Sequence, residues 1–537
     1  MSSDTVERTA SAPALIEEGM KKPILTKDQL ELQAQGHIEE MPRQFTLLAA
    51  VGLAFSITNS WVAISATFQQ PLTAGGGPGT VFALLVASIA CFLITAGLAE
   101  LASAFPTSGG QYHFTFMLAT PGTKAFAAFV TGWLSVIAWI LCTAASAIYA
   151  AQMVAYLVAY YKPNFEPQQY QIWLIYAGIV LLCFFVLTVF PSFLAPLEQM
   201  FFFCSIIAFL VFFITILATS PTKNPPKAVF VDFNNQCGWS DGVAFLLACG
   251  TAMYTFIGTD SVVHIAEEIP SPTLKVPRTM CLTMVIGIAT SMPWCIALLF
   301  SGGDLESLRN SSQPIQTMFL AATRSHGAST FFTCWFLFIY FGATLSCLAA
   351  TGRQAWAFSR DGGLPFSQWN SYISPNRQMP ANATLFCSLV IIVYGLIYVG
   401  STLAFNSFVN ASILVMNVSY VVPQAISLYR GRDKVLPERA FDLGAFGPYI
   451  NGFSIIWVTV FAVLFCFPVT SPTTVQSMNY VSVVVVGVVV VILGGWYGGK
   501  RRTFTGPKAL VLLGGDEDSR IIVGQDLHLN SVEAPKK

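Results

Sequence analysis

Two titratable residues, Asp260 and His264, stand together inside an apolar stretch of the chain. Residues four apart share one face of a helix, so the His264 imidazole is placed to shift the pKa of the Asp260 carboxyl group. A carboxylate in an apolar environment is costly to bury, and it can meet an ammonium group or carry a proton. The alternative task for Asp260 is to cap a half-helix.

A second group of polar residues interrupts an earlier apolar stretch between Gly52 and Trp61. It contains Ser56, Thr58 and Asn59, whose hydroxyl and amide groups can contact a ligand. The N–H groups that begin the following half-helix carry partial positive charge and suit a carboxylate. Alternatively, these small polar side chains only bond back to a kinked helix.

Both polar groups lie within segments of membrane-spanning length, and the second break covers Phe256 to Asp260. In a bilayer an interrupted helix is tolerated only where its freed backbone groups face protein or water. Two such breaks at matching places in the two halves of a chain are typical of a secondary transporter's binding site. We therefore expect the two breaks to lie side by side.

Composition indicates an integral membrane protein. The 537 residues are 54% hydrophobic and 10% charged, and the mean hydropathy is +0.63. A soluble domain carries about 25% charged residues. The net charge is zero, which argues against a nucleic-acid partner because that would require a basic face.

Apolar runs of about 20 residues predict an all-α protein with twelve transmembrane helices. The predicted spans are 45–68, 80–104, 124–150, 170–190, 197–219, 243–264, 279–300, 328–351, 381–400, 405–428, 452–468 and 479–498. They form one transmembrane domain, 43–498. Polar tails, 1–42 and 499–537, flank it; both are expected on the cytoplasmic side, and the first is expected to be disordered and to contain no removable signal peptide.

Loop charges predict the orientation. With both termini in the cytoplasm, fourteen lysines and arginines of the short loops lie inside and five lie outside, which fits the positive-inside rule. Asn310 begins a glycosylation sequon on the predicted outer side. The plasma membrane is the expected location, and a vacuolar or other internal membrane is the alternative.

No phosphate-cradling G-x-x-x-x-G-K-[ST] run occurs, so ATP does not drive the expected transport. We expect no enzymatic activity, no cofactor and no metal site. An ion channel is disfavoured because paired helix breaks indicate alternating access rather than an open pore.

Six short motifs resemble the amino acid-polyamine-organocation superfamily. They are FSITNSW (55–61), AELASAFPTSGGQY (99–112), GTDSVVHIAEE (258–268), VPR (276–278), AFSRDGGLP (357–365) and MNY (478–480). The first, the third and the last look most like the fungal amino acid/choline branch, which includes choline and 4-aminobutyrate permeases.

The resemblance implies a five-plus-five inverted repeat, the leucine-transporter-like fold, with two additional helices. Helices 1 and 6 would be unwound at the substrate, and helices 1, 2, 6 and 7 would rock against a scaffold that contains helices 3 and 8. The implied partners are membrane lipid, a small amine or amino acid and a coupling ion, H⁺ or Na⁺.

Aromatic residues and Gly258 complete the predicted substrate site. Aromatic faces attract ammonium groups by up to about 2 kcal/mol when desolvated. The candidates are Trp61, Trp133, Tyr254 and Phe256. Each is also suited to a core or lipid-facing position, because 13% of the chain is aromatic. Thr259 stands where many relatives have an aromatic residue that contacts the substrate. We therefore do not expect an aromatic contact from this position here.

The coupling ion is left open by the sequence. A proton would need titratable groups such as Asp260 and His264. Proton-coupled relatives place a lysine in helix 5, and none lies between 197 and 219 here. Sodium would use hydroxyls of helix 8, for which Thr344 and Ser346 are available.

Charged residues near the cytoplasmic ends of the helices are predicted to close a gate. The acids are Glu100, Glu267 and Glu268, and the arginines are Arg278, Arg353 and Arg360. We expect salt bridges between the two sets rather than a path for protons.

The leading prediction is a permease for choline, 4-aminobutyrate or a related amino acid. One alternative is a transporter of a nitrogenous secondary metabolite on the same scaffold. Another is a nutrient sensor that binds without transporting, although short tails of about 40 residues make a signalling role less favoured.

Overall fold

A computed structural model describes residues 26–162, 164–311, 314–374, 378–474 and 478–507. These residues form helices and connecting loops and contain no strand. Eleven of the helical segments are long and apolar enough to cross a membrane. The twelfth predicted span, 243–264, is present as an interrupted segment. The prediction of an all-helical polytopic membrane protein is therefore confirmed.

The long helices keep the predicted order. They are α2 (Leu47–Thr58) with α3 (Ser60–Thr67), α4 (Gln69–Ala104), α6 (Lys124–Tyr161), α7 (Gln169–Val189), α8 (Leu194–Thr219), α11 (Pro272–Ser301), α14 (His326–Arg360), α16 (Ala381–Gly400), α17 (Thr402–Arg430), α19 (Gly447–Leu464) and α20 (Val481–Gly495). The interrupted segment consists of α10 (Asp241–Ala252) and two 3₁₀ turns, η2 (Met253–Phe256) and η3 (Val263–Glu268).

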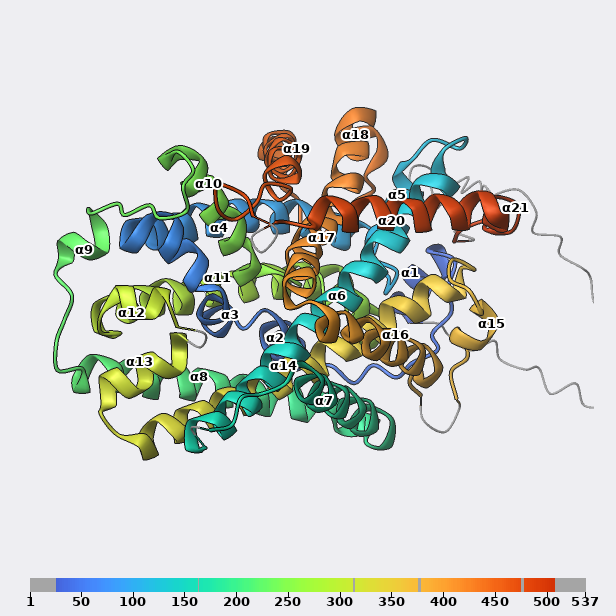
Figure 1. Cartoon of the computed structure of the whole chain (residues 1–537). Coiled ribbons are helices and arrows are strands. Elements are labelled where there is room, and N and C mark those ends of the chain that lie inside the picture. Colours follow the sequence, from blue (N-terminus) through green and yellow to red (C-terminus); the bar gives the residue numbers. More distant parts are fainter. Residues whose placement is uncertain (1–25, 163, 312–313, 375–377, 475–477, 508–537) are drawn as a thin grey trace, which may run out of the picture.

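Short helices connect these spans. They are α1 (Lys27–Ala34), α5 (Gln111–Leu118), η1 (Pro191–Phe193), α9 (Pro226–Phe230), α12 (Leu305–Arg309), α13 (Pro314–Thr323), α15 (Ser367–Asn370), α18 (Arg432–Val435), η4 (Gly444–Phe446), η5 (Trp496–Lys500) and α21 (Arg501–Thr503). In Figure 1, α1 and α21 lie together at the right, which we call the termini side. The opposite side carries α9, α12 and α13.

The core of the molecule is built around α6 and α14, which pack along one another. The α2 helix packs on α14, α8 and α11, whereas α17 packs on α6 and α5. The two interrupted segments are thereby enclosed by long helices. Almost every residue between Ala49 and Val62 is buried.

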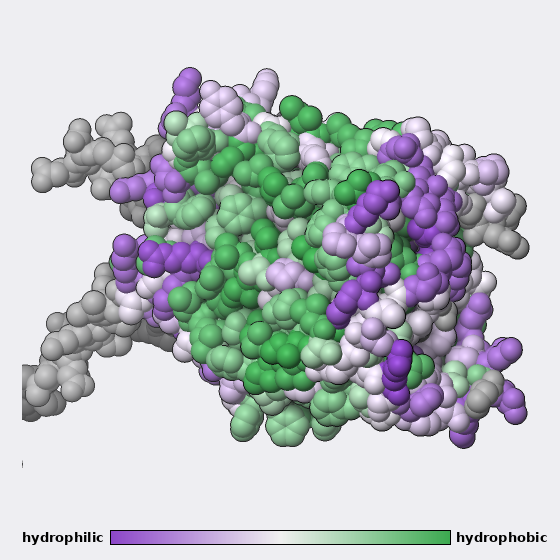
Figure 2. All heavy atoms as spheres, turned by 90° about the vertical axis from the view of Figure 1, so that its left-hand side faces the viewer, coloured by the Kyte–Doolittle hydropathy of each residue, from purple (hydrophilic) through white to green (hydrophobic). Residues whose placement is uncertain are grey.

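The outer surface has the character of a lipid-facing belt. Figure 2 shows a broad apolar area with hydrophilic residues gathered toward its two sides. Large apolar side chains are exposed on peripheral helices, for example Phe185 on α7, Ile214 on α8, Val393 on α16 and Val486 on α20. This exposure is expected where lipid, rather than water, is the solvent.

The structure describes part of each predicted tail. In the first, predicted to be disordered over 1–42, Thr26 and Gln29 form a capping box that starts α1. Ion pairs from Arg43 to Asp28 and Glu39 then hold this segment. At the other end, Phe504 is buried against Phe129. Positions 1–25 and 508–537 of the predicted tails lie outside the described residues.

Candidate functional site

The two helix breaks lie side by side in the core. The first is a single residue, Asn59, with φ 28° and ψ 56° between α2 and α3. The second begins at Ile257, which is extended, and continues through Gly258 with φ 78°. A Cβ on Gly258 would lie 2.8 Å from Cγ2 of Ile57. Glycine is therefore required both by the left-handed backbone and by the close approach.

A small pocket lies between the breaks. It has a volume of about 30 Å³, enough for one or two water molecules. Its wall contains no charged side chain; it is made of Ile57, Thr58, Asn59, Val62, Ala63, Cys142, Ser146, Tyr254, Ile257, Tyr340, Ala343 and Cys347. Both breaks and the scaffold helices α6 and α14 contribute to it.

A larger cavity of about 610 Å³ adjoins this pocket. Tyr254 and Tyr340 line both spaces. The ring of Tyr149 lies 6.2 Å from each of these two rings, measured between centroids. The cavity is also lined by Gln69 at the start of α4 and Pro314 at the start of α13, so it extends toward the opposite side.

Asp260 lies within the second break, between η2 and η3, and is completely buried. Its Oδ2 accepts hydrogen bonds from Gln111 Nε2 at 2.6 Å and Trp139 Nε1 at 3.2 Å, and it lies 3.0 Å from His264 Nε2. Its Oδ1 accepts a hydrogen bond from the Tyr420 hydroxyl at 2.5 Å. Three separate helices, α5, α6 and α17, therefore hold this carboxyl group.

Hydrogen positions in the Asp260–His264 pair follow from their other partners. His264 Nδ1 lies 3.2 Å from the carbonyl oxygen of Ser108 and must carry a hydrogen, because that oxygen only accepts. Trp139 Nε1 lies 3.0 Å from His264 Nε2 and 3.2 Å from Asp260 Oδ2, so the indole N–H is shared between these two acceptors. The ring and the carboxyl group are therefore held together by the same tryptophan.

The predicted residues of the first break take different positions. Thr58 and Asn59 line the small pocket, and Thr58 also donates to the carbonyl of Ala54 at 3.1 Å. Asn59 Oδ1 accepts from Ser205 Oγ at 2.9 Å. Ser56 is buried one turn earlier and does not line the pocket.

Of the four predicted aromatic contacts, one lines the small pocket and three lie elsewhere. Tyr254 lines the pocket, whereas Phe256 turns toward Gly287 of α11. Trp61 packs among Phe209, Phe212, Trp294 and Phe336 and donates to Ser205. Trp133 lies against Phe129 and Phe358, away from the pocket. The tryptophan of α6 that contacts the second break is Trp139.

The predicted ion ligands Thr344 and Ser346 both have partners. Thr344 Oγ1 lies 2.9 Å from Ser146 Oγ, across the α6–α14 contact. Ser346 Oγ lies 2.9 and 2.7 Å from the two carboxyl oxygens of Glu198 on α8. Glu198 is completely buried, and no ion pair reaches it from the described part of the chain.

Ion pairs close the termini side. Arg353 pairs with Glu268, and Arg360 pairs with Glu267 at 2.9 Å. Burial raises the pKa of Glu267, but Arg360 and neighbouring hydrogen bonds outweigh it, so the pKa lies below its usual value. The structure therefore brings together two acids and two arginines of the predicted gate.

The other two gate candidates differ from the prediction. Glu100 pairs with Arg432 at 2.6 Å and Arg439 at 2.9 Å, not with Arg278, Arg353 or Arg360. Arg278 is exposed on α11 and joins no ion pair within the described ranges. Arg432 and Arg439 follow α17, more than 300 residues after Glu100. Their ion pairs with Glu100 therefore cannot be predicted from the distance between them in the sequence.

Residues that the sequence reasoning missed include Gln111, Trp139, Glu198, Ser205 and Tyr420. Glu198 had a usable signal, because a single acid in the apolar run 194–219 is a functional candidate. Gln111 belongs to the motif 99–112, which entered the sequence analysis only as part of the family resemblance. Asn310, the predicted glycosylation site, is exposed at the end of α12 on the opposite side.

Known proteins resemble this chain over most of its length. A family model described as amino acid permease matches residues 45–491. A choline transporter of Saccharomyces cerevisiae is 31% identical over 486 residues, which cover 90% of this chain and 86% of the relative. An amino-acid permease of Arabidopsis thaliana is 26% identical, with 91% and 98% covered. A swainsonine transporter of Arthroderma benhamiae is 28% identical, with 90% and 96% covered.

Proposed function

Because the chain belongs to the amino acid permease family, we propose that it is a secondary transporter of a small amine or amino acid that works by alternating access. It is a multi-pass membrane protein and a permease rather than an enzyme. The observation that carries the proposal is the meeting of two helix breaks at one pocket. Half-helix ends at that pocket offer N–H groups on one wall and carbonyl groups on the other.

The asymmetry of the two sides supports alternating access. Ion pairs close the termini side, whereas the 610 Å³ cavity extends from the pocket toward the opposite side. This is the arrangement of one end state of a rocking cycle. With the termini side in the cytoplasm, as the positive-inside rule favours, the cavity faces outward, and the plasma membrane is the natural location.

The pocket favours a compact ammonium compound, with choline as the leading candidate. Its wall carries no charged residue, and Tyr254 and Tyr340 present aromatic rings to it. Tyrosine faces attract ammonium groups without a counter-charge. A pocket of about 30 Å³ must enlarge to admit such a ligand, and movement of the two tyrosine rings toward the adjoining cavity would provide that space.

Proton coupling through Glu198 is the mechanism that fits the hydrogen-bond count. Ser346 Oγ also lies 2.9 Å from the carbonyl oxygen of Gly342, and a serine has one hydrogen to donate. If that hydrogen goes to Gly342, the contact between Glu198 and Ser346 requires a hydrogen on Glu198. An ionised Glu198 would instead be buried with too few donors, at a cost of several kcal/mol.

The surroundings of Glu198 place it where a proton would affect movement. Gly52 of α2 approaches the backbone of Glu198, because a Cβ there would lie 2.8 Å from its carbonyl oxygen. Ser56 of α2 lies near the same carboxyl group, and Ser346 belongs to α14. Loss of the proton would leave a charge at the crossing of three helices and favour their rearrangement.

A second candidate substrate class is a nitrogenous secondary metabolite. The similarity to a swainsonine transporter supports it, at an identity close to that of the other relatives. A bulkier ring compound would require more enlargement of the small pocket than choline does.

Uptake into cells that lack their own permeases tests the proposed function. Labelled choline, 4-aminobutyrate, a panel of amino acids and swainsonine would be supplied with and without a protonophore and sodium. We expect saturable choline uptake that the protonophore lowers and that sodium removal leaves unchanged. Absence of saturable uptake for every compound would contradict the proposal.

A matched pair of glycine variants tests the site itself. Gly258→Ala introduces a Cβ that clashes with Ile57 in a strained backbone, and we expect at least tenfold slower uptake. Gly178→Ala on α7 meets nothing within 4 Å and is the control. Equal uptake by both variants, at equal surface expression, would contradict the location of the site.

A further inference from the structure

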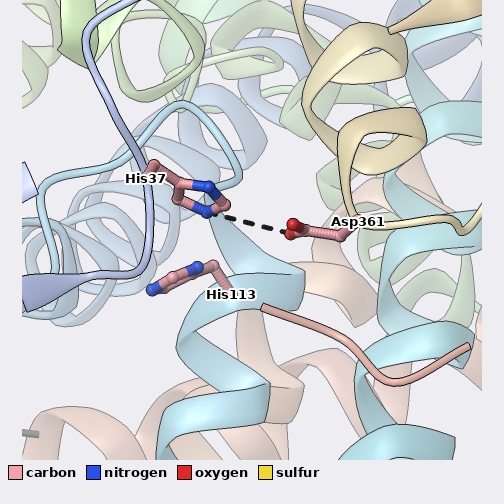
Figure 3. A group of neighbouring side chains, drawn as sticks. All are labelled: His37, His113 and Asp361. Carbon is pink, nitrogen blue, oxygen red and sulfur yellow. Dashed lines mark ion pairs between the residues drawn. The ribbon is translucent and has the colours of Figure 1, made fainter. Parts of the chain in front are cut away.

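A cluster of potential metal ligands lies on the termini side, outside the transport site. It consists of His37 in the segment after α1, His113 on α5 and Asp361 at the end of α14. One ligand atom from each residue lies within 4.8 Å of the others. The His37 and His113 rings lie 5.7 Å apart between centroids with their planes tilted by 50°, and the Asp361 carboxylate points toward His37 (Figure 3).

The cluster is buried. His113 is completely inaccessible to solvent, and the side chains of His37 and Asp361 are 4% and 6% exposed. His37 Nε2 lies 3.9 Å from Asp361 Oδ2, too far for a hydrogen bond. Two buried nitrogens, His37 Nε2 and His113 Nδ1, have no hydrogen-bond partner in the described structure. Two buried nitrogens at one place, both without a partner among the described residues, are available to bind a cation.

The orientation of His113 is that of a metal ligand. Its Nε2 lies 3.0 Å from the side-chain oxygen of Gln35, which can only accept, so Nε2 carries the hydrogen. Nδ1 is then left with a free lone pair on the side of the ring that faces His37 (Figure 3). Metal-bound histidines commonly donate their second N–H to an oxygen in this way.

Asp361 has a matching outer partner, since the Tyr112 hydroxyl lies 2.8 Å from its Oδ2. The nearby Arg360 is compensated by Glu267 and, at 3.8 Å, by Glu40. It therefore opposes a bound cation less than a free arginine would.

We propose that His37, His113 and Asp361 bind a divalent first-row transition metal ion, Zn²⁺ being the best suited, and that this ion fastens the N-terminal segment to the closed gate. Two imidazoles and one carboxylate suit Zn²⁺, which takes such ligands at about 2.0–2.2 Å. Ligand atoms in a tetrahedral site stand roughly 3.3 Å apart, so ligand atoms now up to 4.8 Å apart must approach one another by up to about 1.5 Å.

The consequence for transport follows from where the segment lies. Residues 26–46 contact the gate directly: Gln44 donates to Glu268 at 2.8 Å, and Asp28 accepts from the backbone of Ser271 at 2.9 Å. His37 belongs to this segment, whereas His113 and Asp361 belong to the helical bundle. A shared ion would cross-link the two and hold the termini side closed.

Metal binding by the purified full-length protein is the first test. The protein would be stripped with a chelator and dialysed against ZnCl₂, and bound zinc would be measured by elemental analysis. Co²⁺ would be used in parallel, because its visible absorption reports coordination geometry. We expect one ion per chain, and at least a tenfold loss of affinity in His113→Gln. His326→Gln is the control, since His326 lies at the start of α14 on the opposite side.

If His113→Gln misfolds, two further variants allow the zinc-binding measurement to test the proposal. His37→Gln changes a residue outside the bundle, and Gln35→Ala removes only the hydrogen bond to His113. The first should lose the site, and the second should weaken affinity by about tenfold. Unchanged zinc binding in all three variants, or an equal loss in His326→Gln, would overturn the proposal.

Protection from trypsin tests the fastening without relying on transport. Cleavage after Lys27 and Arg43 would be followed with ZnCl₂ or MgCl₂ present. We expect Zn²⁺ to slow cleavage at least fivefold in the wild-type protein and to have no effect in His37→Gln. Equal cleavage rates with and without zinc, despite bound metal, would overturn the fastening role. This outcome would leave the proposed transport function untouched.

Discussion

Two buried carboxyl groups in the membrane-spanning region, Asp260 and Glu198, have opposite surroundings. Three helices donate hydrogen bonds to Asp260, and His264 Nε2 lies 3.0 Å from its Oδ2. Glu198 has Ser346 as its main partner, and that serine has a second acceptor. A carboxyl group whose oxygens all accept hydrogen bonds holds the surrounding helices in place. A carboxyl group with too few donors becomes unstable when it loses its proton, so its surroundings are expected to change with its protonation.

This difference changes the interpretation of Asp260. The sequence identifies it as the prominent charge beside the second break, available to a substrate amine. Within the structure its oxygens are already occupied by protein donors. Its hydrogen bonds hold the second break against α5, α6 and α17, and Glu198 is the residue for which we propose proton transfer.

The largest expected effect is that of Asp260→Ala. The change leaves Gln111, Trp139 and Tyr420 without their acceptor, and a broken buried network costs about 3–5 kcal/mol. Thermal unfolding in detergent should show a large loss of stability, and uptake should be abolished. The milder Asp260→Asn keeps the shape of the side chain but removes its charge. Comparing the two variants therefore separates the effect of the charge from that of the geometry. Wild-type stability in the alanine variant would contradict the fixing role.

Glu198→Gln is expected to affect coupling rather than stability. The amide resembles the protonated acid, so the protein should fold normally and exchange labelled for unlabelled substrate. Accumulation that a protonophore abolishes in the wild-type protein should be lost. The measurement is the ratio of exchange to net accumulation in proteoliposomes. Full proton-driven accumulation by this variant would remove Glu198 from the mechanism.

Tyr420→Phe removes one of the donors to Asp260 and nothing else. A hydrogen bond to a charged group contributes about 1.5–3 kcal/mol, so stability should fall by that amount. Tyr398→Phe is the control, because its hydroxyl has only a long contact of 3.3 Å with Gln152. An equal effect of both changes would mean that the network around Asp260 is not special.

The smallest effect is expected from Ser346→Ala. It removes the partner of Glu198 at a cost of about 1 kcal/mol, and proton-driven uptake should fall a few fold while exchange persists. Ser412→Ala, which removes a bond only to the carbonyl of Val409 on the same helix, is the control. If the two serine variants take up substrate at equal rates, Ser346 does not act through Glu198.

Particular residues show which features of the fold and the site can be predicted from the sequence. The spans and both breaks are local features, because hydropathy and polar interruptions are read along one segment. The tryptophan of α6 is not such a feature. Trp133 and Trp139 are six residues apart, so they differ by about 9 Å along the helix and 240° around it. Only the packing of α6 against the second break selects Trp139.

The sequence by itself determined the membrane class, the number and order of the spans, the position of both breaks and the acids and arginines available to a gate. The tertiary structure decided which acid pairs with which arginine, which carboxyl group is saturated and which is not, and that His37 meets His113 and Asp361. The reason is physical. Helix formation in lipid depends on neighbouring residues, whereas hydrogen-bond saturation depends on side chains brought together from distant parts of the chain.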